Sequence, residues 1–158
     1  MSSPYAGPRH TGAVQLAPGS WGANGDFSMW IGPKTLWTWQ RLWPLEERFW
    51  AVAAAALADP AQHAVLAQAT RSLLLLQSSD WQFIISTGEV ADYAERRFIE
   101  HAEDTSRLIA ALEGAPGVDL DGTRAFAETL RARDDVFPGV LDGLRVALAG
   151  SAQAGTAG

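Results

Sequence analysis

The sequence predicts an all-α fold, a helical bundle of about four to five helices with a loop-rich N-terminal segment. Apolar residues recur at spacings of three to four from residue 33 onward, and no alternating stretch is long enough to define a strand. The chain is 47% hydrophobic and 19% charged, which excludes a disordered, charge-driven chain. We expect a loop-rich connector with a tryptophan loop over residues 1–32, a helical bundle domain over 33–148 and a disordered tail over 149–158.

The first predicted helix covers residues 33–58, where Leu36, Trp43 and Trp50 recur at helical spacing. Pro44 lies inside this segment and lacks a backbone N–H group. We therefore expect the helix to kink there or to restart with Pro44 in its first turn.

The tryptophans of this helix are interpreted as packing residues, because large aromatic residues at helical spacing more often fill a core than bind a ligand. They are Trp37, Trp39, Trp43 and Trp50. Trp37 lies off the face that the other three share, so we assign it to a contact with another domain.

After residue 60 the apolar pattern predicts four more helices. A second helix over 61–77 is apolar nearly all round and belongs in the centre. The stretch 77–87 interrupts the pattern, and Ser86 with Glu89 matches a capping box that starts the third helix. One face of that helix repeats every 3.5 residues: Ala94, Phe98, His101, Thr105, Leu108 and Leu112. Two shorter helices follow, over 123–133 and 137–148.

Charge and composition exclude several classes of function. The net charge of −6 and the pI near 4.9 argue against a nucleic-acid-binding protein. The chain has no cysteine, so disulfides and thiolate sites are excluded. No apolar run approaches the roughly 20 residues that cross a bilayer, so no membrane partner is expected and the cytoplasm is the default location.

The sequence also offers no metal or cofactor motif. The three histidines fall at no metal-ligand spacing. Asp119, Asp121 and Gly122 match a fragment of a calcium loop, but the other ligands and the closing glutamate are missing, so we interpret the fragment as a turn. We expect no cofactor.

Trp21 and Trp30 flank the segment WGANGDFSMW in the N-terminal loop. An exposed indole stacks on the apolar face of a sugar ring while polar neighbours bind the hydroxyls, and a loop on a rigid scaffold aims it. Alternatively, both rings plug the end of the helical core, which residue composition alone favours.

The segment QSSDW, from Gln77 to Trp81, places hydrogen-bonding side chains at the end of the most apolar predicted helix. Unsatisfied polar groups there would cost about 1–3 kcal/mol each. They bond either to the local backbone at a helix end or to sugar hydroxyls or a neighbouring domain. The residues alone favour neither interpretation.

Two stretches of the chain, APGSWGANGDFSMWIGPKTLWTW and RSLLLLQSSDWQFIISTGEVADYAERRFIEH, resemble the C-terminal helical domain of the glycoside hydrolase family 57 branching enzymes. The resemblance covers most of the chain from Pro4 to about Leu112. Enzymes of this family cut an α-1,4-glucan and transfer the fragment to a 6-hydroxyl group, forming an α-1,6 branch. The resemblance implies α-1,4-glucan as ligand, the family's catalytic barrel as partner and glycogen biosynthesis as the pathway.

The resemblance also implies site residues. It gives glucan-facing roles to Trp21 and Trp30, and it gives Asp80 and Trp81 a part in shaping the cleft or the domain contact. The family's catalytic glutamate and aspartate belong to the barrel, which this chain does not contain, so no catalytic residue is assigned. A retaining glycosidase needs two carboxyl groups about 5 Å apart. Because the family's pair lies in the barrel, we expect the chain alone to be inactive.

Three functions therefore compete. The chain is a branching-enzyme domain that completes the glucan cleft of a barrel, a stand-alone module that binds α-glucan or protein, or a purely structural bundle. The first predicts an exposed apolar patch around Trp21, Trp30 and Trp37, where the barrel would dock. The last predicts that the two loop tryptophans are buried.

Overall fold

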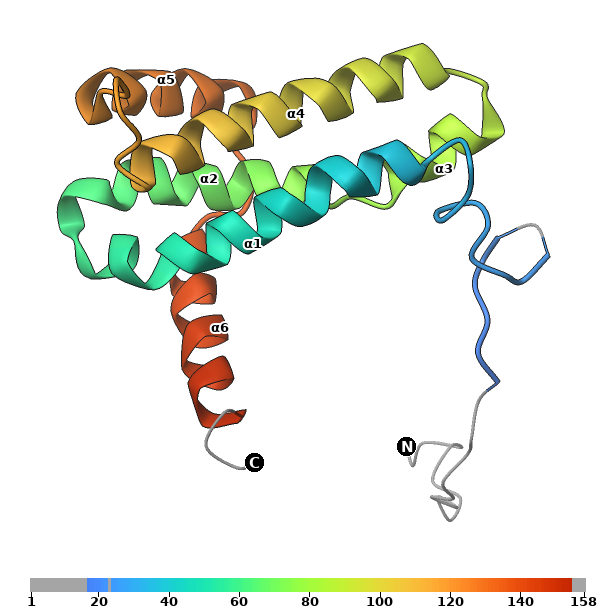
Figure 1. Ribbon diagram of the computed structural model, residues 1–158, viewed down its shortest axis with the longest axis horizontal. Helices are drawn as coiled ribbons and strands as arrows, with labels where there is room; N and C mark the ends of the chain where they lie inside the picture. The colour runs from blue at the N-terminus through green and yellow to red at the C-terminus, as the bar shows by residue number, and fades with distance from the viewer. Residues whose placement is uncertain (1–16, 23, 155–158) are drawn as a thin grey trace, which may run out of the picture.

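The computed structural model describes residues 17–22 and 24–154, and it confirms the all-α prediction (Figure 1). These residues contain no strand. The elements are α1 (Leu36–Ala58), η1 (Pro60–Gln62), α2 (His63–Leu76), α3 (Asp80–Thr87), α4 (Ala91–Leu112), α5 (Leu120–Arg133) and α6 (Val140–Ala154). The part of the predicted connector before residue 17 lies outside the described residues.

Helix α1 continues through Pro44 without interruption, so the predicted restart at that residue is wrong. Pro44 and Gln40, whose carbonyl group loses its usual donor, are both on the exposed side of the helix. That carbonyl group can bond to solvent on this side, so the missing hydrogen bond does not end the helix.

The face of α1 that packs on the bundle is not the tryptophan face. Its buried residues are Thr38, Leu42, Leu45, Phe49, Ala53 and Ala56. Trp43 and Trp50 are 49% and 48% exposed, so the interpretation of these two as core residues is wrong. Both stripes have helical spacing, and the stripe with smaller side chains lets α1 approach α2 and α4 closely.

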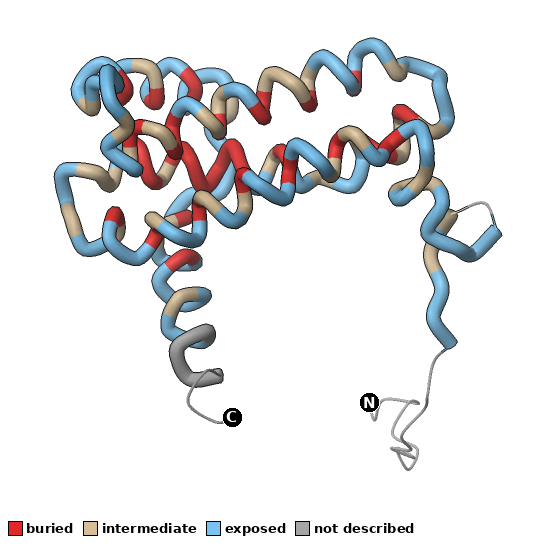
Figure 2. The backbone as a smooth tube through the Cα atoms, viewed as in Figure 1, coloured by how far each residue is buried: buried red, intermediate tan, exposed pale blue. Residues whose placement is uncertain are grey.

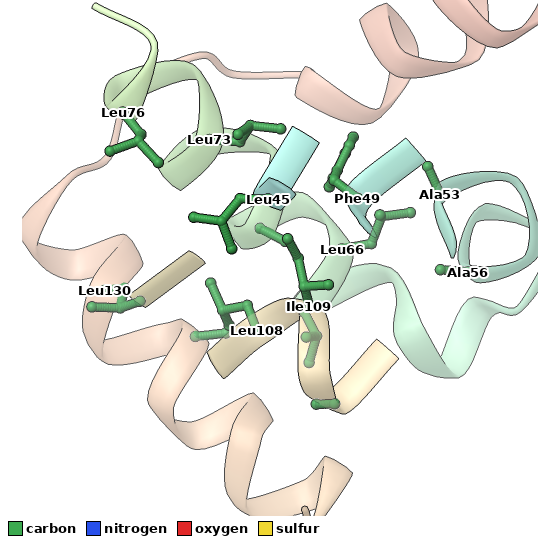
Figure 3. Packing of buried hydrophobic residues seen from close by; sticks show 14 of the residues in the cluster. Leu45, Phe49, Ala53, Ala56, Leu66, Leu73, Leu76, Leu108, Ile109 and Leu130 are labelled. Carbon is green, nitrogen blue, oxygen red and sulfur yellow. The ribbon is translucent and has the colours of Figure 1, made fainter. Parts of the chain in front are cut away.

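Helix α2 is the centre of the bundle, as predicted, and contacts α1, α4, α5 and α6. Buried side chains of α1, α2 and α4 pack into one cluster, which includes Phe49, Leu66 and Leu108 (Figure 3). The buried segments concentrate where these helices meet (Figure 2). This core packs α1, α2 and α4 together.

Helix α3 was not predicted. The segment interpreted as an interruption forms α3, and Ser86 lies inside it, so the capping box assigned to Ser86 and Glu89 is wrong. The Ser86 hydroxyl donates to the Met29 carbonyl oxygen instead, and Gly88 ends the helix with a φ of 83°. Helix α4 begins at Ala91, and the face predicted for it is buried from Ala94 to Leu108.

The last two helices differ from their predicted limits: α5 begins earlier, at Leu120, whereas α6 begins later, at Val140, and ends later. Asp119, interpreted as a turn residue, caps α5 by accepting from the N–H groups of Asp121 and Gly122. Helix α6 reaches Ala154, so the part of the predicted 149–158 tail up to that residue is helical rather than disordered. Residues 155–158 lie outside the described part.

The arrangement of these elements leaves one side of the bundle framed by two projections (Figure 1). Helix α6 points away from the bundle, and the loop that precedes α1 extends to the same side at the opposite end. Within the described residues, no helix combines the length and hydropathy needed to cross a membrane.

Candidate functional site

Trp21 and Trp30 come together around Phe83 of α3. The ring centroid of Phe83 lies 5.4 Å from that of Trp21 and 6.4 Å from that of Trp30, with the ring planes tilted by 35° and 32°. Trp21 is 81% exposed and Trp30 is half-buried. The interpretation that both rings plug the core is therefore wrong, and the three rings form an aromatic cluster at the surface.

Trp30 is fixed by hydrogen bonds at both ends of the residue. Its carbonyl oxygen accepts from the Trp39 indole Nε1 and from the Thr35 hydroxyl, each at 2.7 Å. Its own indole Nε1 donates to the Ser79 carbonyl oxygen at 3.1 Å. Because the partners lie on α1 and at the start of α3, the orientation of Trp30 follows that of the helical scaffold.

The loop that carries Trp21 is held mainly by local bonds. The backbone N–H of Ser20 donates to the Gly25 carbonyl oxygen at 2.9 Å, and Gly25 adopts a φ of 68° that favours glycine. A Cβ atom on Gly22 would lie 2.7 Å from the Asp26 carbonyl oxygen, so that turn also needs glycine. The glycines of the WGANG motif are thus explained by the turn.

The carboxylate of Asp26 closes the other half of this loop. It accepts from the backbone N–H of Ser28 at 2.9 Å and from the Ser28 hydroxyl at 2.6 Å. These hydrogen bonds lower the pKa of Asp26 below its usual value. A general acid needs a raised pKa, so Asp26 has the wrong character for that role.

The QSSDW segment uses most of its polar groups inside the protein. The Ser78 hydroxyl donates to the Asp80 carboxylate at 3.2 Å. The indole of Trp81 donates to the Leu75 carbonyl oxygen at 2.8 Å and its ring lies 5.8 Å from that of His101. Trp81 is thus a half-buried support for α3, whereas the exposed Asp80 directly follows the Ser79 that binds Trp30.

The buried His101 does not offer acid–base chemistry to this site. Desolvation is the main cause that lowers its pKa, and the nearby Arg97 guanidinium lowers it further. His101 is 2% exposed and therefore remains neutral inside the bundle. In the described part of the chain, no group of three acidic or histidine residues is placed to hold a metal ion.

A groove of about 380 Å³ lies beside the same loop. Its lining mixes hydroxyl, ammonium and apolar groups: Ser28, Met29, Gly32, Pro33, Lys34 and Ser86. The Lys34 ammonium donates to the Ser86 carbonyl oxygen at 3.3 Å, which joins the loop to the end of α3. The groove and the aromatic cluster are thus both built from the loop that precedes α1 and from α3.

A second exposed apolar feature follows α1. Leu36, Trp43 and Trp50 recur every seven residues on a half-exposed face beside the buried face of α1, and we name them the α1 stripe. The stripe ends at an apolar groove of about 490 Å³ between α1, α2 and α6, whose lining includes Trp50, Leu74 and Phe137. Trp37 is not part of it: its ring packs at 5.3 Å against Phe98 with the ring planes nearly perpendicular, and the residue is half-buried, so its contact with another domain stays a prediction.

Comparison with protein families identifies this scaffold. A family model described as the C-terminal part of 1,4-alpha-glucan branching enzyme matches residues 42–142, from the middle of α1 into α6. The chain belongs to this family. The match extends beyond the Leu112 at which the resemblance of the sequence motifs ends, and it includes α5.

The sequence of this branching-enzyme domain is similar to part of two larger proteins. The 1,4-alpha-glucan branching enzyme of Thermococcus kodakarensis is 36% identical over 140 residues, which are 88% of this chain and 20% of that enzyme. A probable 1,4-alpha-glucan branching enzyme of Mycobacterium tuberculosis is 33% identical over 141 residues, which are 84% of this chain and 26% of that protein. The chain thus spans about a fifth to a quarter of the length of these relatives.

Solved structures give the same assignment. A family 57 branching enzyme from Pyrococcus horikoshii matches with a TM-score of 0.71 and 32% identity, over 85% of this chain and 26% of that one. The Thermococcus kodakarensis enzyme, solved in complex with glucose and additives, matches with a TM-score of 0.66 and 36% identity, over 83% and 24% of the two chains. The branching-enzyme domain is therefore a C-terminal domain of the family 57 type.

Phe83 is the residue of the candidate site that the sequence pattern did not predict. It lies in the segment interpreted as an interruption, where no periodic pattern distinguishes it from its neighbours. Once α3 is recognised, Gln82 and Ile85 form its buried side and Phe83 is left facing the loop.

Proposed function

We propose that this branching-enzyme domain completes the glucan-binding cleft of a family 57 catalytic barrel that lies outside the chain. In this role it takes part in glycogen or α-glucan biosynthesis without supplying a catalytic residue. The cytoplasmic location expected from the sequence remains part of this proposal. The single observation that carries the proposal is the exposed cluster of Trp21, Phe83 and Trp30, aimed by a rigid helical scaffold.

Each site residue has a place in this proposal. The faces of Trp21 and Trp30 stack on glucosyl rings, since indole faces suit the apolar faces of sugars. Asp80, exposed at the first turn of α3 beside Ser79, accepts a hydrogen bond from a sugar hydroxyl group. Trp81 supports the cleft from behind, because its N–H group is already bonded to Leu75.

The α1 stripe is the face proposed to meet the barrel. Its three side chains are large and apolar, as in the surfaces that domain interfaces bury, and the adjoining groove adds Leu74 and Phe137. Exposed apolar patches of this kind mark interaction surfaces.

Electrophoresis of the chain through gels with and without glycogen tests the glucan-binding part of the proposal. We expect weak retardation by glycogen, and we expect Trp21→Ala to remove it, because stacking on an exposed ring supplies much of the contact. Tyr93→Ala is the matched control, since Tyr93 is an exposed aromatic residue on α4, outside the cluster. Equal mobility of wild type and Trp21→Ala in glycogen would count against glucan contact by this cluster.

Repeating the electrophoresis with an added family 57 barrel distinguishes the cleft-completing role from that of a stand-alone module. A cleft-completing domain forms a complex with the barrel and binds glycogen more tightly within it. A stand-alone module is retarded by glycogen equally with and without the barrel, and that result would favour the alternative function.

A further inference from the structure

We infer that Phe83 is the positioning residue that sets the angle between the two tryptophans of the cluster. The inference rests on the proposed function for its meaning, but its geometry is independent of glucan. Among the described residues, Phe83 is the one ring that contacts Trp21, and it also contacts Trp30. It is thus the shared support of the two indoles.

The two tryptophans depend on Phe83 to different degrees. Trp30 has three hydrogen bonds to α1, the loop and the Ser79 carbonyl oxygen, so it stays in place without a ring beside it. The backbone around Trp21 is bonded within its own turn, through Ser20, Gly22 and Gly25. The ring contact at 5.4 Å therefore sets how Trp21 lies against the helical scaffold.

Trp30 and Phe83 are hydrogen-bonded to the same backbone atom, the carbonyl oxygen of Ser79. The Ser79 carbonyl oxygen accepts from the indole of Trp30 at 3.1 Å and from the backbone N–H of Phe83 at 3.2 Å, in the first turn of α3. The ring of Phe83 and the ring of Trp30 are thereby fixed to the same point. Trp21 then takes its position from Phe83, so both stacking faces are ordered before a sugar binds, which lowers the entropic cost of binding.

The first test is spectroscopic and needs no glucan. In two-dimensional NMR of the full chain labelled with ¹⁵N, the indole signal of Trp21 is assigned from its disappearance in Trp21→Phe. We expect Phe83→Leu to shift and sharpen this signal, because the neighbouring ring is lost and the indole moves freely. The indole signal of Trp81, bonded to Leu75, is the internal control and should keep its position. An unshifted Trp21 signal in Phe83→Leu would overturn the inference.

The second test measures glycogen affinity by the same electrophoresis. We expect Phe83→Leu to raise the apparent dissociation constant about three- to tenfold, the range of one aromatic contact. Phe83→Tyr keeps the ring and should restore wild-type affinity, which a general loss of apolar volume would not explain. If Phe83→Leu is unfolded at the assay temperature, Phe83→Met is measured in its place. Failure of Phe83→Tyr to restore affinity would contradict a ring-specific role.

The results distinguish a failure of the proposed function from a failure of the positioning role. If Trp21→Ala leaves glycogen binding unchanged while Phe83→Leu shifts the Trp21 signal, the proposed function fails and the positioning role stands. If Trp21→Ala abolishes binding while Phe83→Leu changes neither signal nor affinity, the positioning role fails and the proposed function stands.

Discussion

Replacing Trp30 with alanine is expected to lower kcat/KM for branching about 30-fold in an enzyme completed by this domain, a loss of about 2 kcal/mol that is typical of a central tryptophan contact. The enzyme is a chimera in which the domain replaces the aligned segment of the Thermococcus kodakarensis branching enzyme, to which it is 36% identical. A large loss is expected because Trp30 joins the loop to Ser79 and, in the proposed function, also stacks on the glucan. Formation of α-1,6 linkages on amylose, followed by NMR, measures it.

Trp30→Phe distinguishes these two contributions. Phenylalanine keeps an aromatic face but lacks the N–H group that donates to the Ser79 carbonyl oxygen. Its kcat/KM should fall between those of wild type and Trp30→Ala. Activity of Trp30→Ala equal to wild type would show that this ring does not border the cleft.

Replacing Phe98 with alanine is expected to lower the free energy of unfolding by about 3–5 kcal/mol, since it leaves a large cavity in the core. Phe98 is 0% exposed on α4 and receives the edge-on contact of Trp37 from α1. The loss is a large part of the roughly 5–15 kcal/mol that stabilises a domain. Chemical denaturation of the chain, followed by circular dichroism, measures it.

The control for this change is Tyr93→Ala on the same helix. Tyr93 is 47% exposed, and surface substitutions usually change stability by less than about 0.5 kcal/mol. A loss at Phe98 no larger than the loss at Tyr93 would mean that α4 does not pack on α1 as described.

Periodicity predicted every helix except the short α3, but it did not predict which side of α1 faces inward. Two apolar stripes follow that helix, one through Leu42 and Phe49 and one through Trp43 and Trp50. Spacing reveals that a stripe exists, and only packing against α2 and α4 decides between two of them. The general tendency of tryptophan to be buried therefore led to the wrong stripe.

The candidate site shows a second limit of sequence reasoning. Trp21 and Trp30 were selected from the motif, but their meeting at Phe83 joins residues far apart in the chain. The hydrogen bond from Trp30 to Ser79 has the same long range. A helix as short as α3 gives too few residues for a period, so the residue that links the two tryptophans could not be found before the fold was known.

The most direct test of the cleft-completing role is a comparison of branching by three proteins. They are the intact Thermococcus kodakarensis enzyme, the same enzyme without its segment aligned to this chain, and the chimera in which this chain replaces that segment. We expect that removal of the segment abolishes α-1,6 linkage formation on amylose and that the chimera restores it. If the shortened enzyme, shown to be folded, branched amylose as fast as the intact one, the domain would not complete the cleft.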